Sequence, residues 1–456
     1  MSTVMRPEDR ERLIDKFGAI VEENDKIDPE LYKKYNVKRG LRDLDGTGVL
    51  VGLTEIGDVR AYIFDEEEKI PVEGRLLYRG MEINDIVHGF QSEKRFGFEE
   101  CCYLLLFGQL PNKAELEEFQ NLLGEFRALP VGFTEDMILK APSKDIMNKL
   151  ARSVLASYSY DPNPDDISLK NILRQCIELI ARFPTMAAYG YSAKAHYHDG
   201  RSLYIHSPVK HLSTAENILH MIRLDSSYTA AEAELLDLAL VLHAEHGGGN
   251  NSTFVAHVVT STGTDTYSTI AAAIGSLKGP QHGGANLKVM GMMEEIKNHV
   301  KDWDDEDEIG AYLAKIMRKE AFDKSGLIYG VGHAVYTVSD PRTILLKQKA
   351  ESISKEKGLD KEYRLYTHVE KLAPEIFYKE KKSDKVMCAN VDFYSGFVYK
   401  TLNIPVELFT PIFAIGRMAG WCAHRIEELV NGGRIIRPAY KNVEPKKSYV
   451  PMGERG

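Results

Sequence analysis

Two histidines with a spacing of three, His243 and His246, end an apolar run and precede the glycines of residues 247–249. On one helix face, such a pair is typical of a metal site. The pattern is not HExxH, however, and no nearby cysteine or third ligand accompanies it. At a helix end, the imidazoles would instead cap the last carbonyls or bind an anionic substrate. The spacing alone leaves these three hypotheses open.

A third histidine, His282, lies among the glycines of residues 279–284, ahead of a methionine-rich helical stretch. The positive end of a helix dipole disfavours an imidazolium ion and lowers the histidine pKa. A neutral imidazole can still donate one hydrogen bond to a carbonyl oxygen that develops negative charge. The alternative is an ordinary loop histidine, but the flanking glycines favour function because they let a ligand approach the backbone closely.

A fourth histidine, His333, follows a Gly-Val-Gly segment at residues 330–332. This segment begins like a dinucleotide fingerprint, but Val335 occupies the third glycine position. No strand–helix–strand unit is predicted around it, which disfavours a Rossmann fold. We therefore expect a flexible glycine loop that presents His333.

One carboxylate and three arginines complete the candidates. Asp392 lies among apolar and aromatic residues, where it could be a helix N-cap or, if buried beside a substrate, a general base. Arg342 follows an Asp-Pro pair that predicts a helix start, and its position would suit a carboxylate or a phosphate. Arg417 lies in an apolar helical stretch, where an unpaired charge is costly. Each arginine, including Arg437, could clamp an anion or form a structural ion pair.

Helical periodicity dominates the elements that must position these residues. Apolar stripes predict helices at 112–126 and 170–183, and a further long helix is expected at about 408–430. Capping boxes that begin at Ser213 and Thr229 predict two more helix starts.

Strand signals are few and lie near the N-terminus. They occur at 49–53, 61–64 and about 75–78. Because strands and helices do not alternate regularly, a parallel α/β sheet is disfavoured. We predict a mainly α protein with a small N-terminal β element.

Composition narrows the function classes. The chain has 456 residues and a formal net charge of −9, without a concentrated basic patch, so a general nucleic-acid binder is not expected. The longest apolar stretch, 404–422, is interrupted by Glu407 and Arg417, so no membrane span is expected. The five cysteines lack CxxC spacing, and no apolar leader is visible at the N-terminus. These features favour a cytoplasmic protein with reduced thiols.

Taken in order from about residue 40 to residue 437, the motifs resemble the citrate synthase family. They are the segments at residues 73–80, 243–246, 279–286, 330–336, 340–342, 390–396 and 408–417. The resemblance implies a helical, two-domain homodimer. A large domain at 1–283 plus 404–456 would form the dimer and hold oxaloacetate, and a small domain at 284–403 would close over it from the CoA side.

The resemblance also implies the reaction and the role of each residue. The enzyme would be an acyltransferase of the tricarboxylic acid cycle, which condenses acetyl-CoA with oxaloacetate and water to give citrate and CoA. Asp392 would remove the methyl proton, His282 would donate to the thioester oxygen, and His333 would polarise the ketone. Oxaloacetate would be bound by His246, Arg342, Arg417 and, from the second subunit, Arg437. CoA would touch Gly330, Val331 and Gly332.

No metal and no tightly bound organic cofactor is implied. The nearest alternative is 2-methylcitrate synthase, which uses propionyl-CoA with the same residues. A different class, a metal-dependent hydrolase, would use His243, His246, His282 and Asp392.

Overall fold

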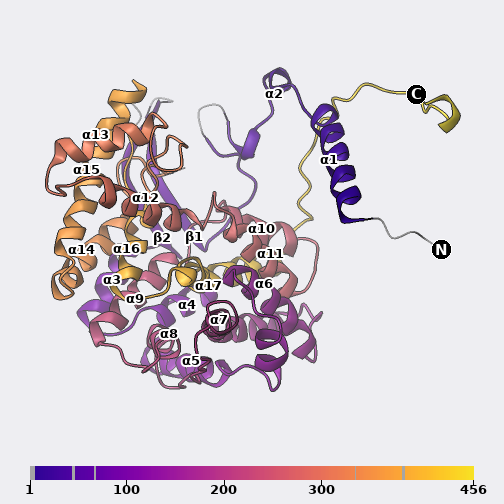
Figure 1. The fold of residues 1–456 in the computed structure, drawn as a ribbon. Coiled ribbons are helices and arrows are strands. Elements are labelled where there is room, and N and C mark those ends of the chain that lie inside the picture. The colour runs from indigo at the N-terminus through magenta and orange to yellow at the C-terminus, as the bar shows by residue number, and fades with distance from the viewer. Residues whose placement is uncertain (1–5, 44–46, 66–67, 334, 383–385, 456) are drawn as a thin grey trace. The chain divides into compact units, whose positions relative to one another are not determined.

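The structure is a computed structural model that describes residues 6–43, 47–65, 68–333, 335–382 and 386–455 (Figure 1). The chain divides into two compact units, residues 1–53 and 54–456. The small domain predicted at 284–403 lies within the second unit, and its boundaries stay a prediction.

The first unit contains α1 (Pro7–Asn24) and α2 (Pro29–Lys34), neither of which buries a residue. The strand predicted at 49–53 is wrong, because this segment has no regular secondary structure and its Leu50 and Leu53 side chains are exposed. Strand propensity reflects packing on a pleated, half-buried surface, so an apolar stretch without a partner strand stays irregular.

The second unit begins with an antiparallel sheet in the order β1-β2-β3. Its strands are β1 (Gly57–Asp65), β2 (Glu68–Tyr78) and β3 (Met81–Glu82). The strands predicted at 61–64 and 75–78 are confirmed in β1 and β2. Gly57 pairs with Tyr78, and a register shift between Arg60 and Tyr62 bends β1.

Helices make up most of the second unit. The first nine are α3 (Ile83–Ser92), α4 (Phe98–Phe107), α5 (Lys113–Phe126), α6 (Ile146–Ser157), α7 (Leu169–Tyr197), α8 (Thr214–Ile222), α9 (Ala230–His243), α10 (Asn251–Thr260) and α11 (Thr266–Lys278). The others are α12 (Ala285–His299), α13 (Glu306–Met317), α14 (Pro341–Glu356), α15 (Asp360–Lys381), α16 (Val391–Thr401) and α17 (Phe409–Val430).

Local signals placed several of these helices correctly. α5 and α17 confirm two predictions, and both capping boxes are formed, at Ser213 and Thr229. The helix predicted at 170–183 is longer, since α7 continues to Tyr197 through Pro184. The buried surroundings of α7 supply packing that outweighs the hydrogen bond lost at this proline.

Two groups of helices frame the site. α17 packs against α4, α7, α9, α10 and α11, and Figure 1 shows it in the middle of this group. A second group, α12 to α16, is held together by contacts of α16 with α12 and α14, and of α15 with α13 and α14. Contacts of α9 with α14 and α16 join the two groups. The fold is therefore mainly α with a small sheet, as predicted.

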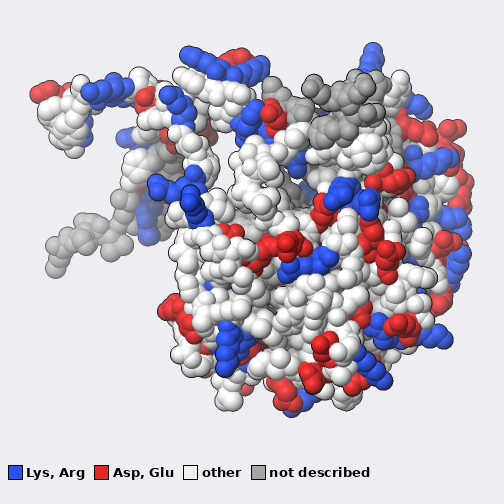
Figure 2. Space-filling view, turned by 180° about the vertical axis from the view of Figure 1, so that it is seen from behind, with Lys and Arg blue, Asp and Glu red and all other residues white. Residues whose placement is uncertain are grey.

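The charges on the surface are mixed in sign (Figure 2), in keeping with a sequence that has no concentrated basic patch. Figure 2 shows acidic and basic side chains interspersed over most of the face in view. Among the described residues, no helix combines the length and the apolar character that crossing a bilayer requires. All five cysteines are free thiols, and four of them are buried.

Candidate active site

The first element of the site is the turn that follows α9. The helix ends at His243, so His246 lies beyond it and the two rings do not share a helix face. His243 Nε2 lies 2.8 Å from the Tyr399 hydroxyl. His246 is buried, and its Nε2 has no hydrogen-bond partner. Burial lowers the pKa of His246 well below its ordinary value, and Arg342 adds to this effect, so the ring is neutral.

The described residues contain no ligand set that would support the metal hypothesis. Within the part of the chain that the structure describes, no group of three or more His, Cys, Asp or Glu side chains could hold a metal ion. The end of α9 explains this result, because the turn after His243 breaks the periodicity that would align two imidazoles.

His282 lies in the turn before α12, as predicted. Its Nε2 accepts a hydrogen bond from the Ser252 backbone N–H at 3.4 Å and lies 3.1 Å from the Ser252 hydroxyl. This network assigns the proton of a neutral ring to Nδ1. Burial lowers the pKa of His282 to about 4, and Arg417 contributes to the shift. The helix end predicted as the cause is therefore not the main one. At neutral pH, His282 offers one N–H donor.

His333 is held in the opposite tautomer. Its Nδ1 accepts from the backbone N–H groups of Val335 and Tyr336, at 3.0 and 3.1 Å. In a neutral ring the proton is then on Nε2. The His333 ring stacks on Tyr336 and lies 5.2 Å from the His246 ring, centroid to centroid. Ala334, between His333 and Val335, lies outside the described residues.

Asp392 is in the first turn of α16, but it does not cap the helix. Asn390 is the N-cap and accepts a hydrogen bond from the Asp392 backbone N–H at 3.0 Å. The Asp392 carboxylate is thus left free, and its Oδ1 is buried without a partner. Burial raises the pKa of Asp392 to about 7, although Arg342 and Arg417 oppose the shift. This value suits a proton acceptor that works near neutral pH.

Arg342 and Arg417 are both buried but differ in their partners. Arg342 makes a bidentate ion pair with Asp340, at 3.0 and 2.7 Å. Arg417 donates from Nε to the His243 carbonyl at 2.7 Å, while both of its terminal nitrogens have no partner. Burial lowers the pKa of Arg417 to about 10. A buried cation with two unused donors is prepared for an anionic ligand.

Six of the seven predicted catalytic and oxaloacetate-binding residues come together. Arg342, His333, Arg417 and His282 interact electrostatically with His246. Arg342 and Arg417 also interact with Asp392.

Arg437 is the exception. It is exposed, and the backbone N–H of the neighbouring Ile436 donates to Ser261 at the C-terminal end of α10. Ser252, which holds His282, lies at the N-terminal end of this helix, about 14 Å away at 1.5 Å per residue. This chain does not by itself bring Arg437 to the cluster.

The loop predicted to contact CoA is bound to the start of α16. The Gly332 N–H donates to the Cys388 carbonyl at 2.8 Å, and the Asn390 amide donates to the Gly332 carbonyl at 2.8 Å. Gly330 has a φ of +79°, and a Cβ atom there would lie 2.8 Å from Val289 and 2.9 Å from Phe393. The loop thus lies beside the helix that carries Asp392.

Sequence reasoning did not single out two buried, unpartnered polar side chains that follow His282 and Asp392 along the chain. Asn286 is buried on the first turn of α12 with both of its amide atoms unpartnered, and the Ser395 hydroxyl is also buried and unpartnered. Nothing in a single sequence separates such residues from ordinary helix positions. Ser252 gives only a weak signal in the sequence, because it lies three residues after the glycine run.

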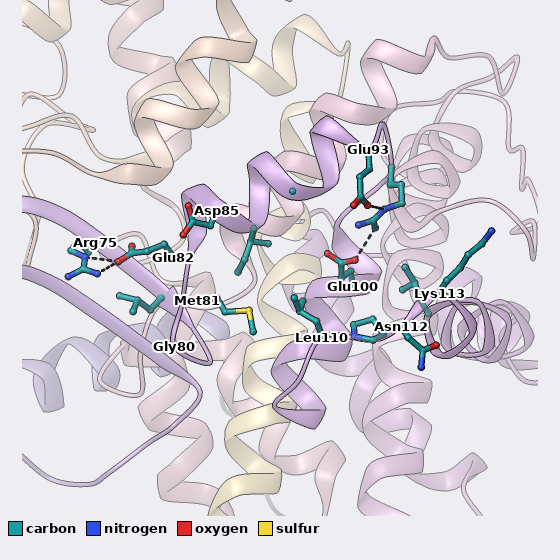
Figure 3. A pocket seen from close by; sticks show the side chains of 16 residues that line it. Arg75, Gly80, Met81, Glu82, Asp85, Glu93, Glu100, Leu110, Asn112 and Lys113 are labelled. Atoms are coloured by element: carbon teal, nitrogen blue, oxygen red, sulfur yellow. Dashed lines mark hydrogen bonds and ion pairs between the residues drawn. The ribbon is translucent and has the colours of Figure 1, made fainter.

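A separate groove lies elsewhere (Figure 3). It has a volume of about 910 Å³ and is lined by β2, β3, α3 and the start of α5. Its charged side chains are largely paired, for example Arg75 with Glu82 and Arg95 with Glu93 and Glu100. None of the predicted site residues lines it.

Known proteins resemble this chain over most of its length. The family model for the C-terminal domain of citrate synthase matches residues 43–439. The chain is 35% identical to a citrate synthase of Synechocystis over 84% of this chain and 89% of that protein. It is 33% identical to a 2-methylcitrate synthase of Shewanella oneidensis over 83% and 92%.

A solved structure of a citrate synthase is also similar to this chain. The citrate synthase of Thermoplasma acidophilum, in a ternary complex with carboxymethyl coenzyme A and oxaloacetate, superposes with a TM-score of 0.75. The match covers 92% of this chain and 99% of that one, at 26% identity. Fold and site together define a helical acyltransferase. The chain belongs to the citrate synthase family.

Proposed function

We propose that this protein condenses acetyl-CoA with oxaloacetate and hydrolyses the resulting thioester, which gives citrate and CoA. One observation carries the proposal. A buried carboxylate with a pKa near 7 interacts with a buried arginine that has two unpartnered nitrogens, and the same cluster contains two imidazoles whose hydrogen bonds assign the proton of each neutral ring to one nitrogen. An enolisation needs this combination of a base and neutral donors.

Oxaloacetate binds first in this proposal. The terminal nitrogens of Arg417 donate to one carboxylate, because they are buried and otherwise unpartnered. Arg342 adds positive charge, and His246 donates or accepts at its unpartnered Nε2. Arg437 would complete the site from the second subunit of a homodimer, which accounts for its position away from the other residues of its own chain.

The condensation follows. Asp392 removes a proton from the acetyl methyl group, and Nδ1–H of His282 stabilises the enolic oxygen of the thioester. The nucleophilic carbon attacks the ketone of oxaloacetate, whose oxygen is polarised by Nε2–H of His333. Neutral imidazoles suit both roles, since they donate a hydrogen bond without fully transferring a proton to the substrate beforehand.

CoA would contact Gly330, Val331 and Gly332, and closure of residues 284–403 would exclude water before the chemistry begins. Hydrolysis then acts on the thioester of the condensation product and not on acetyl-CoA. The proposed reaction uses no metal and no bound organic cofactor, and we propose that it takes place in the cytoplasm.

Propionyl-CoA is the alternative acyl donor, and the similarity to a 2-methylcitrate synthase supports keeping it. One methylene in an apolar pocket changes selectivity by only about 1–3 kcal/mol, so the motifs do not decide between the donors. The test is thiol release with oxaloacetate and each acyl-CoA, compared as kcat/KM. A larger value for acetyl-CoA is expected, and a clear preference for propionyl-CoA would assign the second activity. Activity that is lost on exhaustive chelation and restored by a metal would contradict the metal-free mechanism.

A further inference from the structure

A buried chain of four titratable side chains runs from the site toward the surface, and the mechanism does not use it. Glu245 accepts from His424 Nε2 at 3.0 Å, His424 Nδ1 lies 3.1 Å from His257 Nε2, and His257 Nδ1 lies 2.9 Å from Glu428. The side chains of Glu245 and His424 are fully buried, whereas that of Glu428 is 17% exposed. Both ends of the chain are carboxylates, and its middle is a pair of imidazoles.

Counting hydrogens gives the charge of this chain. Each of its three hydrogen bonds needs one hydrogen, and an ionised carboxylate supplies none. Two neutral imidazoles carry two N–H groups in total, which is one hydrogen too few. All three bonds exist together only if the chain holds one additional proton, on a ring or on the Glu428 carboxyl. Burial and the neighbouring His424 lower the pKa of His257, so the two rings do not both become charged.

The surrounding charges act in both directions, because Glu427 favours retention of the additional proton, whereas Arg417 and Arg79 oppose it. On α17, Glu427 lies 3.9 Å from His424 Nδ1 and accepts from the Glu55 backbone N–H. Arg417, on the same helix, and Arg79, in the turn between β2 and β3, both interact electrostatically with Glu245. The hydroxyl of Tyr78, on β2, hydrogen-bonds to the Glu245 backbone at 3.3 Å.

Glu245 connects the chain to the site. Its carboxylate also accepts from the Gly247 N–H, so it closes the turn that contains His246. Two glycines make room for it, because a Cβ atom at Gly57 or Gly420 would lie 2.6 or 2.5 Å from the Glu245 side chain. If this hydrogen-bonded chain of side chains loses its additional proton, two N–H donors remain for three hydrogen bonds, and Glu245 and Glu428 compete for them. The negative charge of Glu245 then also competes with a substrate for Arg417.

We infer that the chain Glu245–His424–His257–Glu428 positions the turn of His246 by holding one additional proton, so that loss of this proton weakens oxaloacetate binding. Its substrate assignment rests on the proposed function. The four residues are positioning residues, since none of them is expected to touch the reacting atoms. The KM for oxaloacetate, rather than kcat, should rise with pH, by up to tenfold per pH unit once the proton is lost.

Glu428→Gln gives a sharp test. A glutamine amide can donate to His257 Nδ1, so all three bonds form with two neutral imidazoles and the additional proton is no longer needed. Glu427→Gln is the matched control, because it removes the same charge one residue away and leaves the chain intact. KM for oxaloacetate should be measured from about pH 6 to about pH 9, and each variant should be compared with the parent at every pH, because Asp392, with a pKa of about 7, and Arg417, with a pKa of about 10, are present in all three proteins.

We expect KM to rise with pH in the parent and in Glu427→Gln, and to rise less steeply in Glu428→Gln. A parent KM that does not change with pH, or a Glu428→Gln profile that follows the parent, would overturn the inference. Calorimetric binding of oxaloacetate over the same range separates this inference from the proposed function. A parent that binds oxaloacetate with the expected pH dependence but releases no thiol from either acyl-CoA would reject the function and keep the inference.

Discussion

The catalytic cluster and the open groove of Figure 3 contain similar residue types but treat their charges differently. In the groove, Arg95 is paired with two glutamates and remains partly exposed. In the cluster, Arg417, Asp392 and His246 are buried with polar atoms that have no partner. An unpartnered buried polar atom costs about 1–3 kcal/mol, so a fold keeps several in one place where a polar ligand will satisfy them. Unsatisfied polar atoms, rather than volume, mark the site.

The largest effect should come from the carboxylate of the cluster. Asp392→Asn keeps the shape of the side chain and removes the proton acceptor, so kcat for condensation should fall by about 10² to 10⁴. Binding of oxaloacetate, measured by calorimetry, should stay within a factor of about three, because the binding contacts are made by other residues. Unchanged kcat would reject Asp392 as the base.

The two buried arginines of the cluster allow an unpaired charge, Arg417, to be compared with a paired one, Arg342. Arg417→Met should raise the dissociation constant of oxaloacetate by about two orders of magnitude, since a desolvated charge contact is lost. It should not lower the free energy of unfolding, because it removes a buried charge whose terminal nitrogens are unpaired.

Arg342→Met is the matched control. It leaves Asp340 buried without its partner, and this should cost about 3–5 kcal/mol in unfolding by denaturant. Equal stability losses in the two variants would contradict the difference drawn between a paired and an unpaired arginine.

The pH dependence of catalysis tests the raised pKa in the cluster. Asp392 must be ionised to accept a proton, and its pKa in the free protein is about 7. The value of kcat/KM for acetyl-CoA, measured at saturating oxaloacetate, should therefore fall about tenfold for each pH unit below 7 and level off above it. An acidic limb with its midpoint near 4, the ordinary range of an aspartate, would show that burial does not control this group.

The smallest effect should come from the groove. Lys113→Ala and Asp85→Asn change side chains that line it, and neither residue is part of the cluster. Both kcat and the KM for oxaloacetate should stay within a factor of about two, as is usual for exposed substitutions away from a site. A tenfold loss in either constant would mean that the groove takes part in the reaction.

Local signals in the sequence went a long way toward this fold. The stripe at 112–126, the capping boxes at Ser213 and Thr229, and the start of α14 at Pro341 all reflect interactions within a few residues, and the structure contains each of them. The strand predicted at 49–53 failed because a strand depends on a partner that local sequence does not contain.

The sequence by itself determined which residue types could perform acid–base chemistry and where helices begin, because both depend on neighbours along the chain. Only the tertiary structure decided which nitrogen of each histidine carries the proton, and that Asn390 rather than Asp392 caps α16. It also decided that Glu245, His424, His257 and Glu428 form one chain, since these contacts join residues as far apart as 179 positions. Burial, tautomer and pairing arise from distant segments that fold together, and no local pattern encodes them.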